Sequence, residues 1–438
     1  MKTKEMKGIT LVALVVTIVV LLILAGVSIN LVLGDNGIIA KAKEAKRKSA
    51  EATQNDLIGM NELAQQLEEK INGSAGGGAG TKVPAEATAE TAPYFPNNTF
   101  TKKEGTIDTG LVIKDASGNE YVWVVVPKSL YNNTSYNSNN AKKPSSSTDY
   151  ANIEYCLQQY TATYRNGTNY SDTYAADTDN VGWFADETAY NNLKNSMLKS
   201  VYENGGFYVG RYEAGIRTNR ASIESQVDGK YPVPTTASVT KADAYPYTYV
   251  TRTQAQNLAS NVNSGTKTSS LMFGVQWDLV LAFMHNKGKI ADITLTSNST
   301  TIGNYYNSTF DLNRGKYAQY GQLGNPWKNF DSALGSIVVS NETTGKMKKT
   351  EQSSDSNSIL ITTGGTEQSK VMNIYDIAGN VWEWTLEKNS DTSRSCARGG
   401  GYNNAGPGLP AADRNSNSID YSNNLRFPCF TFLGKAER

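Results

Sequence analysis

The amino-acid sequence predicts an α+β protein in which a long N-terminal helix precedes an irregular, loop-rich domain. Three observations support this fold class: an uncharged apolar run at 9–33, a stretch rich in Ala, Lys, Glu and Gln after it, and scattered β-branched and aromatic runs further on. A chain of 438 residues has room for one large domain, or two smaller ones, in addition to a stalk. No internal repeat is visible.

The apolar run 9–33 is long enough to cross a bilayer as a helix. Lys2, Lys4 and Lys7 precede it, so we expect the N-terminus to stay cytoplasmic and the rest of the chain to be exported. A cleaved secretory signal has a shorter apolar core and a small-x-small site, which this segment lacks. The sequence therefore predicts a protein of the cytoplasmic membrane whose C-terminal domain faces the cell surface.

The start of this run, KGITLVALVV, resembles the N-termini of type IV prepilins. The resemblance implies that 1–8 is a leader, that prepilin peptidase cuts after Gly8, and that Ile9 undergoes methylation as the new N-terminus. It also implies the pilus assembly machinery and other pilin subunits as partners. The family usually has Glu at the fifth mature position, where this chain has Ala13, so polymerisation stays open. A plain membrane anchor is the alternative.

We predict a transmembrane and stalk helix over 9–72, bent or broken by GDNG. Its second half is rich in good helix formers, and spacings of three and four put one set of apolar residues on a single face: Leu57, Met60, Ala64, Leu67 and Ile71. That face packs either on its own domain or on neighbouring subunits. Gly, Ala, Ser and Pro then predict a flexible linker at 73–95, followed by one exported domain at 96–438.

Regular elements are sparse in the exported domain. Strands are predicted at 120–127 and 205–215, where β-branched and aromatic residues are bounded by Gly or Pro. The predicted helices are 185–205, 251–262 and 274–286. Between these elements we expect long Ser/Thr/Asn/Tyr loops, such as 129–180 and 286–370, held by buried tryptophans, ions or side-chain hydrogen bonds.

Composition excludes several functional classes. A net charge of +1 gives no broad attraction to nucleic acid, so we expect no nucleic-acid partner. The single histidine, His285, excludes multi-histidine metal sites and is the only base available for a nucleophilic triad. Its place after an apolar run and before NKGK favours a structural or surface role. Abundant Asn, Ser, Thr, Gly and Tyr are typical of an exported surface protein.

The three cysteines allow at most one intrachain disulfide. Cys156, Cys396 and Cys429 show no CxxC spacing. Cys396 and Cys429 flank a polar segment and would pair if strands bring them together. Free buried thiols are the alternative.

The strongest local pattern is NIYDIAGNVWEWTLE. Gly379 allows a tight turn, after which Trp382 and Trp384 alternate around Glu383 as in a strand. An acid between two large aromatic residues is costly to bury unless it is paired or bound to a cation. Asp376 lies upstream and could join it on a hard cation such as Ca²⁺, with backbone carbonyls filling the coordination shell.

YDIAGNVWEWT followed by RGGGY resembles the formylglycine-generating-enzyme/sulfatase-modifying-factor family, a branch of the C-type lectin fold. FYVGRYEAG, YPYTYVTRTQAQNLA and GVQWDLVLAF occur in the family's order, so the resemblance covers about 121–430. It implies a C-type lectin-like domain with a structural calcium site formed by Asp376, Gly379, Val381 and Glu383. In the alternative, Glu383 pairs with an arginine such as Arg398 and no ion binds.

The resemblance does not extend to the family's chemistry. Enzymatic members oxidise a substrate cysteine with a cysteine pair located where this chain has GGGYNNAGPGLPAADR, and no cysteine lies between Cys396 and Cys429. A single histidine also excludes the His-rich iron sites of paralogous enzymes. We therefore predict no catalytic residues and no enzymatic activity, since a fold alone does not confer function. A surface-anchored enzyme with unrecognised chemistry is the alternative.

The segment 402–424 resembles the diversified region of variable proteins from diversity-generating retroelements. Those proteins carry a C-type lectin domain of this branch and vary near its end at template adenines, so Asn codons of the form AAY are favoured targets. The predicted ligand-binding positions are Tyr402, Asn403, Asn404, Asp413, Asn415, Ser416, Asn417, Ser418, Asp420, Tyr421, Ser422, Asn423 and Asn424. Residues between them, including Ala412, Arg414, Ile419 and Leu425, would form a fixed scaffold. The alternative is an ordinary surface loop, and LRFP stands where the family ends in G-F-R.

Together these features predict a pilin-like adhesin or receptor that displays a C-type lectin-like domain. Tyrosine gives a large contact area at low entropic cost, and Ser and Asn give adaptable hydrogen bonds to an unknown protein or glycan ligand. The other possibility is a structural minor pilin that caps or primes a filament.

Overall fold

The computed structural model describes residues 86–165, 170–175, 184–220, 234–262, 269–319, 327–332, 335–389, 395–417 and 431–433. All of them belong to one unit, Gly77–Arg438, which is separate from Met1–Gly76. The predicted leader, its processing residues Gly8 and Ile9, the transmembrane and stalk helix and most of the linker lie outside the described residues. None of the helices within the described ranges is both long and apolar enough to cross a membrane.

The described residues form a mixed α+β fold, as predicted. Its helices are α3 (Ser147–Tyr160), α4 (Glu187–Asn204), α5 (Arg252–Ser260), α6 (Gly274–Asn286) and the short α7 (Asp292–Thr296). Short 3-10 helices occur at Lys128–Asn132, Ala162–Tyr164, Asp355–Asn357 and Glu367–Ser369.

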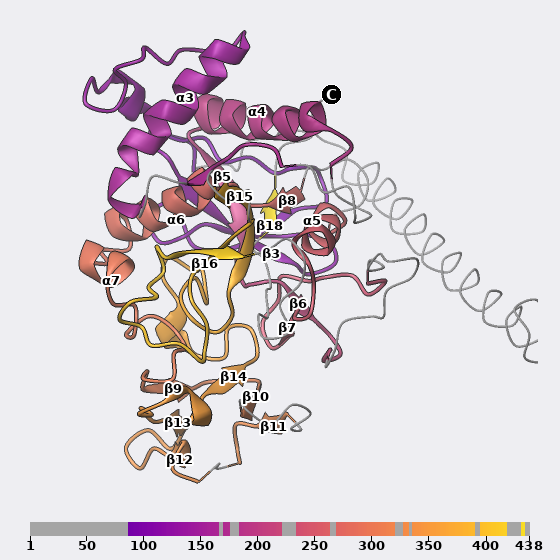
Figure 1. The fold of residues 1–438 in the computed structure, drawn as a ribbon, viewed down its shortest axis with the longest axis vertical. Coiled ribbons are helices and arrows are strands. Elements are labelled where there is room, and N and C mark those ends of the chain that lie inside the picture. The colour runs from indigo at the N-terminus through magenta and orange to yellow at the C-terminus, as the bar shows by residue number, and fades with distance from the viewer. Residues whose placement is uncertain are drawn as a thin grey trace, which may run out of the picture. The chain divides into compact units, whose positions relative to one another are not determined.

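The main sheet has six antiparallel strands in the order β1-β2-β3-β5-β18-β8. Figure 1 labels four of them, β3, β5, β18 and β8. These are Thr101–Glu104, Val112–Lys114, Glu120–Val125, Gly206–Gly210, Thr431–Leu433 and Ser269–Leu271, respectively. The last described strand, β18, lies between β5 and β8. Strand β18 therefore pairs with two strands that come much earlier in the sequence.

A second sheet holds the C-terminal motifs. Its order is β17-β16-β15-β4, with β15 at Glu383–Asn389, β16 at Ser395–Arg398, β17 at Arg414–Asn417 and β4 at Tyr170–Ser171. A two-stranded pair, β6 (Gly215–Ile216) with β7 (Tyr245–Pro246), continues from β5. The WEWT strand and the strand after the RGG turn therefore belong to the same sheet.

Two three-stranded sheets form a lobe beside the main body (Figure 1). Their strands are β9 (Phe310–Leu312), β10 (Lys316–Gln319), β11 (Lys328–Asn329), β12 (Val338–Ser340), β13 (Met347–Lys349) and β14 (Ile359–Ile361). The inner side chains form a hydrophobic cluster of their own, with Phe310, Tyr317, Val338 and Ile361 among its members. We refer to residues 306–363 as the β lobe.

The sequence-based prediction of elements is confirmed for the long, strongly patterned ones. Residues 120–127 and 205–215 contain β3, β5 and β6, and the three predicted helices are α4, α5 and α6. Helix α5 begins where expected because Thr251 and Gln254 form a capping box, each side chain accepting from the other residue's backbone N–H.

Both predicted long loops contain structure, which corrects the prediction. Helix α3 lies within 129–180, although Thr, Asn and Tyr give it weak helix propensity. Its Ser146 cap and a buried face of Ile153, Cys156 and Leu157 stabilise it. The β lobe and α7 lie within 286–370, where strands of two to four residues are too short to show a period-2 pattern.

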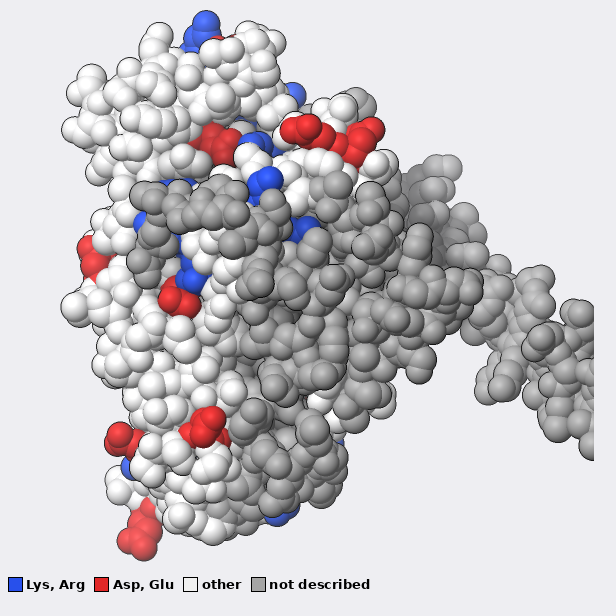
Figure 2. Space-filling model, in the orientation of Figure 1, with Lys and Arg blue, Asp and Glu red and all other residues white. Residues whose placement is uncertain are grey.

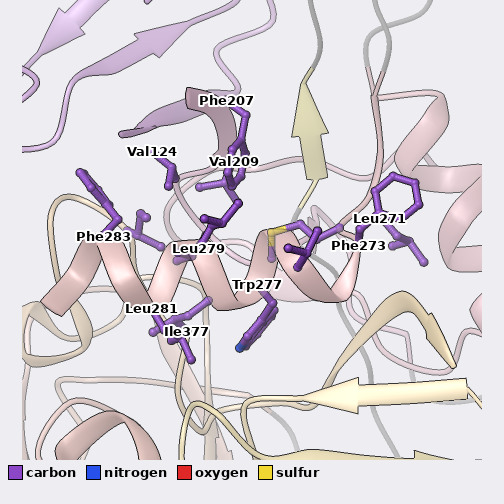
Figure 3. Packing of buried hydrophobic residues seen from close by; sticks show 14 of the residues in the cluster. Val124, Phe207, Val209, Leu271, Phe273, Trp277, Leu279, Leu281, Phe283 and Ile377 are labelled. Carbon is purple, nitrogen blue, oxygen red and sulfur yellow. The ribbon is translucent and has the colours of Figure 1, made fainter. Parts of the chain in front are cut away.

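Helix α6 is the centre of the largest hydrophobic core. It is buried on all sides from Gly274 to Met284. Figure 3 shows Leu279 and Phe283 on the side facing Val124 and Val209 of the main sheet, and Trp277 and Leu281 on the opposite side near Ile377. The helix therefore connects the main sheet to the C-terminal motifs.

Leu279→Ala should lower the free energy of unfolding by about 2–5 kcal/mol, because a fully buried leucine leaves a cavity that close-packed neighbours fill only partly. Urea unfolding followed by tryptophan fluorescence measures the change. Ile293→Ala is the matched control, since Ile293 is 67% exposed and its loss should cost less than about 0.5 kcal/mol. Equal losses in both variants would contradict the central role of α6.

Candidate ligand-binding site

We call residues 402–424 the binding segment; the structure describes it as far as Asn417. It starts at a turn formed by Gly399 and Gly400, whose φ angles are +88° and +78°. A Cβ at Gly400 would lie 2.5 Å from the Leu409 carbonyl oxygen, so only glycine fits there. Tyr305 Oη donates to the carbonyls of Gly399 and Leu409, at 3.0 and 2.9 Å. These two contacts hold together the ends of the loop 399–409, at the start of the segment.

Tyr402 belongs to the frame and not to the surface. The sequence placed it among the ligand-binding positions, but its side chain is 3% exposed and packs with Leu360 and Val381. Its backbone N–H donates to the Asn380 carbonyl at 2.8 Å. We therefore remove Tyr402 from the candidate ligand contacts.

Partly exposed and buried positions are interspersed in the rest of the described segment. The partly exposed predicted positions are Asn403, Asn404, Asp413, Asn415 and Ser416. The residues predicted as scaffold, Ala412 and Arg414, are buried at 0% and 8% exposure. Ser418, Asp420, Tyr421, Ser422, Asn423, Asn424 and the predicted scaffold residues Ile419 and Leu425 lie outside the described residues, and Asn417 is described only as part of β17.

Asn404 also has a local structural role. Its Oδ1 accepts from the Gly401 N–H at 2.9 Å, and its carbonyl accepts from the Tyr306 N–H at 3.1 Å. Only the second bond is independent of side-chain type. Asn404 therefore connects the binding segment to the β lobe through its backbone.

A buried group of two arginines and two acids fixes β17. Arg398 Nη2 lies 2.8 Å from Asp278 Oδ1, and Arg414 Nη2 lies 2.6 Å from Asp278 Oδ2. Arg414 Nε and Arg398 Nη1 also contact Glu387, at 3.1 and 3.4 Å. All four side chains are 0–1% exposed. We call this group, which joins α6, β15, β16 and β17, the Arg–acid network.

The network shows that Arg398, the arginine suggested as a partner of Glu383, pairs with other acids. Glu383 and Arg398 are direct neighbours in the register of β15 and β16. The Arg398 guanidinium nevertheless forms ion pairs with Asp278 and Glu387, and its Nε donates to the Asp413 carbonyl at 3.0 Å. Glu383 is therefore not neutralised by the expected ion pair.

Sequence reasoning missed the acids of this site. Asp278 had one usable signal, because a single acid within the apolar stretch VQWDLVLAF must have a buried partner. Asp172 had none. It directly follows β4, about a hundred residues before α6 in the sequence. Its carboxylate nevertheless accepts hydrogen bonds from the N–H groups of Gly274 and Val275, at 2.6 and 2.9 Å. Burial, with Glu387 and Glu154 nearby, raises the pKa of Asp172 to about 7.

Asn380 connects the site to the rest of the fold. Its Oδ1 accepts from Asn304 Nδ2 and from the Ile361 N–H, at 2.9 and 3.2 Å. Its Nδ2 donates to Glu213 Oε1 and to the Ile361 carbonyl. With Tyr402 bound to its carbonyl, this one amide side chain and its backbone join the main body, the β lobe and the binding segment.

The predicted calcium ligands fit an ion only in part. Asp376 is buried, but its two carboxylate oxygens already accept from Ser369 Oγ and the Gly364 N–H, both at 2.6 Å. Burial raises its pKa to about 6. Glu383 is equally buried, and neither of its oxygens accepts a hydrogen bond from any residue that the structure describes. Gly379 and Val381 form the turn between them, and the Gly379 N–H donates to the Gly399 carbonyl at 2.8 Å.

Across the described ranges, no group of three or more His, Cys, Asp or Glu side chains is arranged to hold a metal ion. A metal in this region would need amide or backbone oxygens to complete its ligands.

The thiols and the histidine have structural surroundings. Cys156 and Cys396 are free and buried, and Cys429, the other half of the suggested disulfide, lies outside the described residues. Burial raises the pKa of Cys156 to about 12 and that of Cys396 well above its usual range. His285 Nδ1 lies 2.9 Å from the Ile290 carbonyl oxygen at the end of α6.

On the face drawn in Figure 2, the described residues form no single large charged patch. Figure 2 shows Lys, Arg, Asp and Glu scattered in small groups over the described part of this face.

No family model matches the chain, and no curated protein is significantly similar to it. Function must therefore be argued from the site itself.

Arg414→Ala should lower the free energy of unfolding by about 3–5 kcal/mol, because it leaves Asp278 and Glu387 buried with incomplete partners. Urea unfolding measures the loss. Arg217→Ala, at an exposed position, is the matched control and should stay within about 0.5 kcal/mol of wild type. A loss of under about 1 kcal/mol for Arg414→Ala would show that the network does not fix β17.

Asp413 should make stability depend on pH between about 4 and 6. Burial raises its pKa to about 6, against the opposing influence of Arg398 and Arg414. Because the folded state binds this proton more tightly than the unfolded state, its contribution is full below the unfolded pKa of about 3.9 and is lost as the pH rises through 6. Comparing melting temperatures of wild type and Asp413→Asn at pH 4, 5, 6 and 7 isolates this contribution. A difference that stays constant with pH would contradict it.

Proposed function

We propose that this chain is a surface-displayed, pilin-like adhesin or receptor whose C-terminal C-type lectin-like domain binds a ligand through the binding segment. The observation that carries the proposal is the interspersion of partly exposed Asn, Asp and Ser with buried Ala412 and Arg414 on a fixed frame. Side chains at the exposed positions can change without disturbing the buried ones. A recognition surface that varies on a constant fold needs this arrangement.

The contacts that hold the binding segment in place support the proposal, because most of them do not involve the side chains at the partly exposed positions. Tyr305 closes the loop at 399–409 through carbonyl oxygens, and Asn404 contacts the β lobe through its backbone. Arg414 is fixed by Asp278 and Glu387, neither of which belongs to the segment. These contacts survive substitution at the partly exposed positions, whereas the bond from the Gly401 N–H to Asn404 Oδ1 depends on the side chain.

A binding role is also favoured over catalysis by the thiols. The oxidases that the sequence resembles need a reactive thiolate. Here the two described cysteines are buried, and burial raises the pKa of both. Asn and Asp occupy the partly exposed positions of the segment instead.

The N-terminal part of the proposal comes from the sequence alone. Prepilin peptidase would cut after Gly8, Ile9 would be methylated, and the apolar run would hold the protein in the cytoplasmic membrane or in a pilus with other pilin subunits. Export then places the domain at the cell surface, where a protein or glycan ligand is accessible.

Diversification predicts a specific pattern of gene variation. In sibling strains, differences should concentrate in codons 402–424 and at adenines of a template copy. Within the described part they should fall on Asn403, Asn404, Asp413, Asn415 and Ser416 and spare Tyr402, Ala412 and Arg414, because the latter are buried. Sequencing this locus in related strains measures the pattern. Differences spread evenly over the domain, or frequent at the buried positions, would remove diversification from the proposal.

Binding itself is tested with the purified full chain on arrays of glycans and surface proteins. For any ligand found, Asn415→Ala/Ser416→Ala should weaken binding by about tenfold or more, because contacts at the centre of an interface carry most of its energy. Thr343→Ala/Thr344→Ala, in an exposed part of the β lobe, is the matched control and should bind like wild type. Unchanged binding in the first variant, or thiol-dependent oxidation of a cysteine peptide, would contradict a binding role for this segment.

A further inference from the structure

One lysine of the β lobe is fully buried without an acid to pair with. Lys349, the last residue of β13, is 0% exposed, and its Nζ donates to the backbone carbonyls of Tyr306 and Ser308, at 3.0 and 2.7 Å. Among the described residues it forms no ion pair. Lysine is almost never fully buried unless it is paired, because an ammonium group loses its hydration in the interior. Burial at this position therefore favours the neutral form of the amine.

The two carbonyls that accept from Lys349 belong to residues 303–308, which we call the junction turn. The turn leads into the first strand of the β lobe, and Ser308 Oγ closes it by accepting from the Tyr305 N–H at 3.1 Å. Tyr305 is also the residue whose hydroxyl holds together the ends of the loop 399–409. The junction turn therefore lies between the buried lysine and the start of the binding segment.

Two further contacts attach the loop 399–409 to the junction turn. The Tyr306 N–H donates to the Asn404 carbonyl at 3.1 Å, and Asn307 Oδ1 accepts from the Gly406 N–H at 3.0 Å. Both contacts use backbone groups of the loop, so they do not depend on which side chains the loop carries. A displacement of the junction turn would therefore break or move the attachments of the binding segment.

The sheet neighbours of Lys349 give its amino group no carboxylate. In register, Lys349 lies opposite Phe310 of β9 and Val338 of β12. The centre of the Phe310 ring is 5.5 Å from Nζ and favours the charged form, but such a contact is weak compared with the loss of hydration. Asp311 lies opposite Lys348, and neighbouring residues of a strand point to opposite faces of the sheet. Asp311 is therefore on the face away from the buried amino group.

The number of hydrogen bonds also matches a neutral amine. An ammonium group has three N–H donors and a neutral amine has two, and the described residues provide two acceptors, both in the junction turn. The turn adds the hydroxyls of Tyr305 and Tyr306 and no charged side chain. Burial lowers the pKa of Lys349 to about 7, against the opposing influence of the exposed Glu351. The amino group therefore changes its charge close to neutral pH.

We propose that Lys349 is a positioning residue for the binding segment: its buried amino group holds the junction turn, and through it the loop 399–409, more firmly when it is neutral than when it is charged. The inference rests on the proposed function in taking 402–424 as the surface that meets a ligand. It adds a form of regulation to that surface, because acidification would loosen its base and leave its side chains unchanged.

The direction of the pH effect follows from proton binding. When the junction turn separates from β13, Lys349 meets water and its pKa returns to the ordinary value of about 10.4. The open form then binds the proton more tightly than the closed form, so protonation favours opening. Above the closed-form pKa of about 7, the opening equilibrium should fall by about tenfold per pH unit; below it, the equilibrium should change little.

Native-state hydrogen exchange of the full chain in detergent, followed by mass spectrometry, measures this opening without any ligand. Exchange of the peptides that cover 303–308 and 399–409 is compared at pH 6, 7, 8 and 9, after correction for the intrinsic exchange rate at each pH. In wild type, the protection of both peptides should rise by about tenfold per pH unit from 7 to 9. Lys348→Met, at a partly exposed position on the opposite face of β13, is the matched control and should show the same rise.

Lys349→Met should remove this pH dependence from both peptides, since methionine has a similar length but neither a charge nor a donor. At pH 9 its protection should be about tenfold below that of wild type, because the Ser308 carbonyl loses its donor. Protection that stays flat in wild type between pH 7 and 9 overturns the proposal, even if the variant does not fold.

A second outcome would also overturn the proposal. If the pH dependence is confined to peptides of the β lobe and spares 399–409, Lys349 supports the lobe alone and does not position the binding segment. None of these measurements uses an adhesion ligand. A failure here therefore leaves the proposed function intact, and a binding segment that meets no ligand leaves the pH dependence of its frame intact.

Discussion

The Arg–acid network is the constraint on which the C-terminal half of this domain depends. Asp278 projects from a mostly apolar helix and accepts hydrogen bonds from both Arg398 and Arg414. Two positive and two negative side chains, each 0–1% exposed, are tolerated in the interior only in a geometry that pairs all four of them. A shift of β17 by one residue would turn Arg414 out of the network and leave Asp278 and Glu387 each without one of their arginine partners. The register of the strand is thereby fixed without an apolar side chain on it.

The same principle explains how a chain rich in Asn, Ser and Thr can have one structure. Long irregular connections bury many backbone groups, and these must be paired. Asn380 satisfies partners in three parts of the chain, and Lys349 donates to the Tyr306 and Ser308 carbonyls at 3.0 and 2.7 Å within the β lobe. Short polar side chains thus replace the extended ladders of larger sheets. The binding segment lies where these contacts meet the Arg–acid network.

The predictable part of the fold was the part with local signals. Helix α6 has a continuous apolar sequence and α5 a capping box, so both were found with nearly correct ends. Helix α3 and the strands of the β lobe were missed because their stability comes from distant partners. In the site, the WEWT strand was predictable from its pattern. The ion pairs of Arg398 were not, because its nearest acid in register is Glu383 and its actual partners are Asp278 and Glu387.

The sequence by itself determined the mixed α+β class, the positions of the longest elements, and the location of a segment rich in small polar side chains. It did so because periodicity, capping residues and glycine turns act over a few residues. Only the tertiary structure decided which of those side chains are available: Tyr402 is buried, and both carboxylate oxygens of Asp376 are occupied by hydrogen bonds. Burial and charge pairing are properties of residues brought together by folding, and local sequence does not record them.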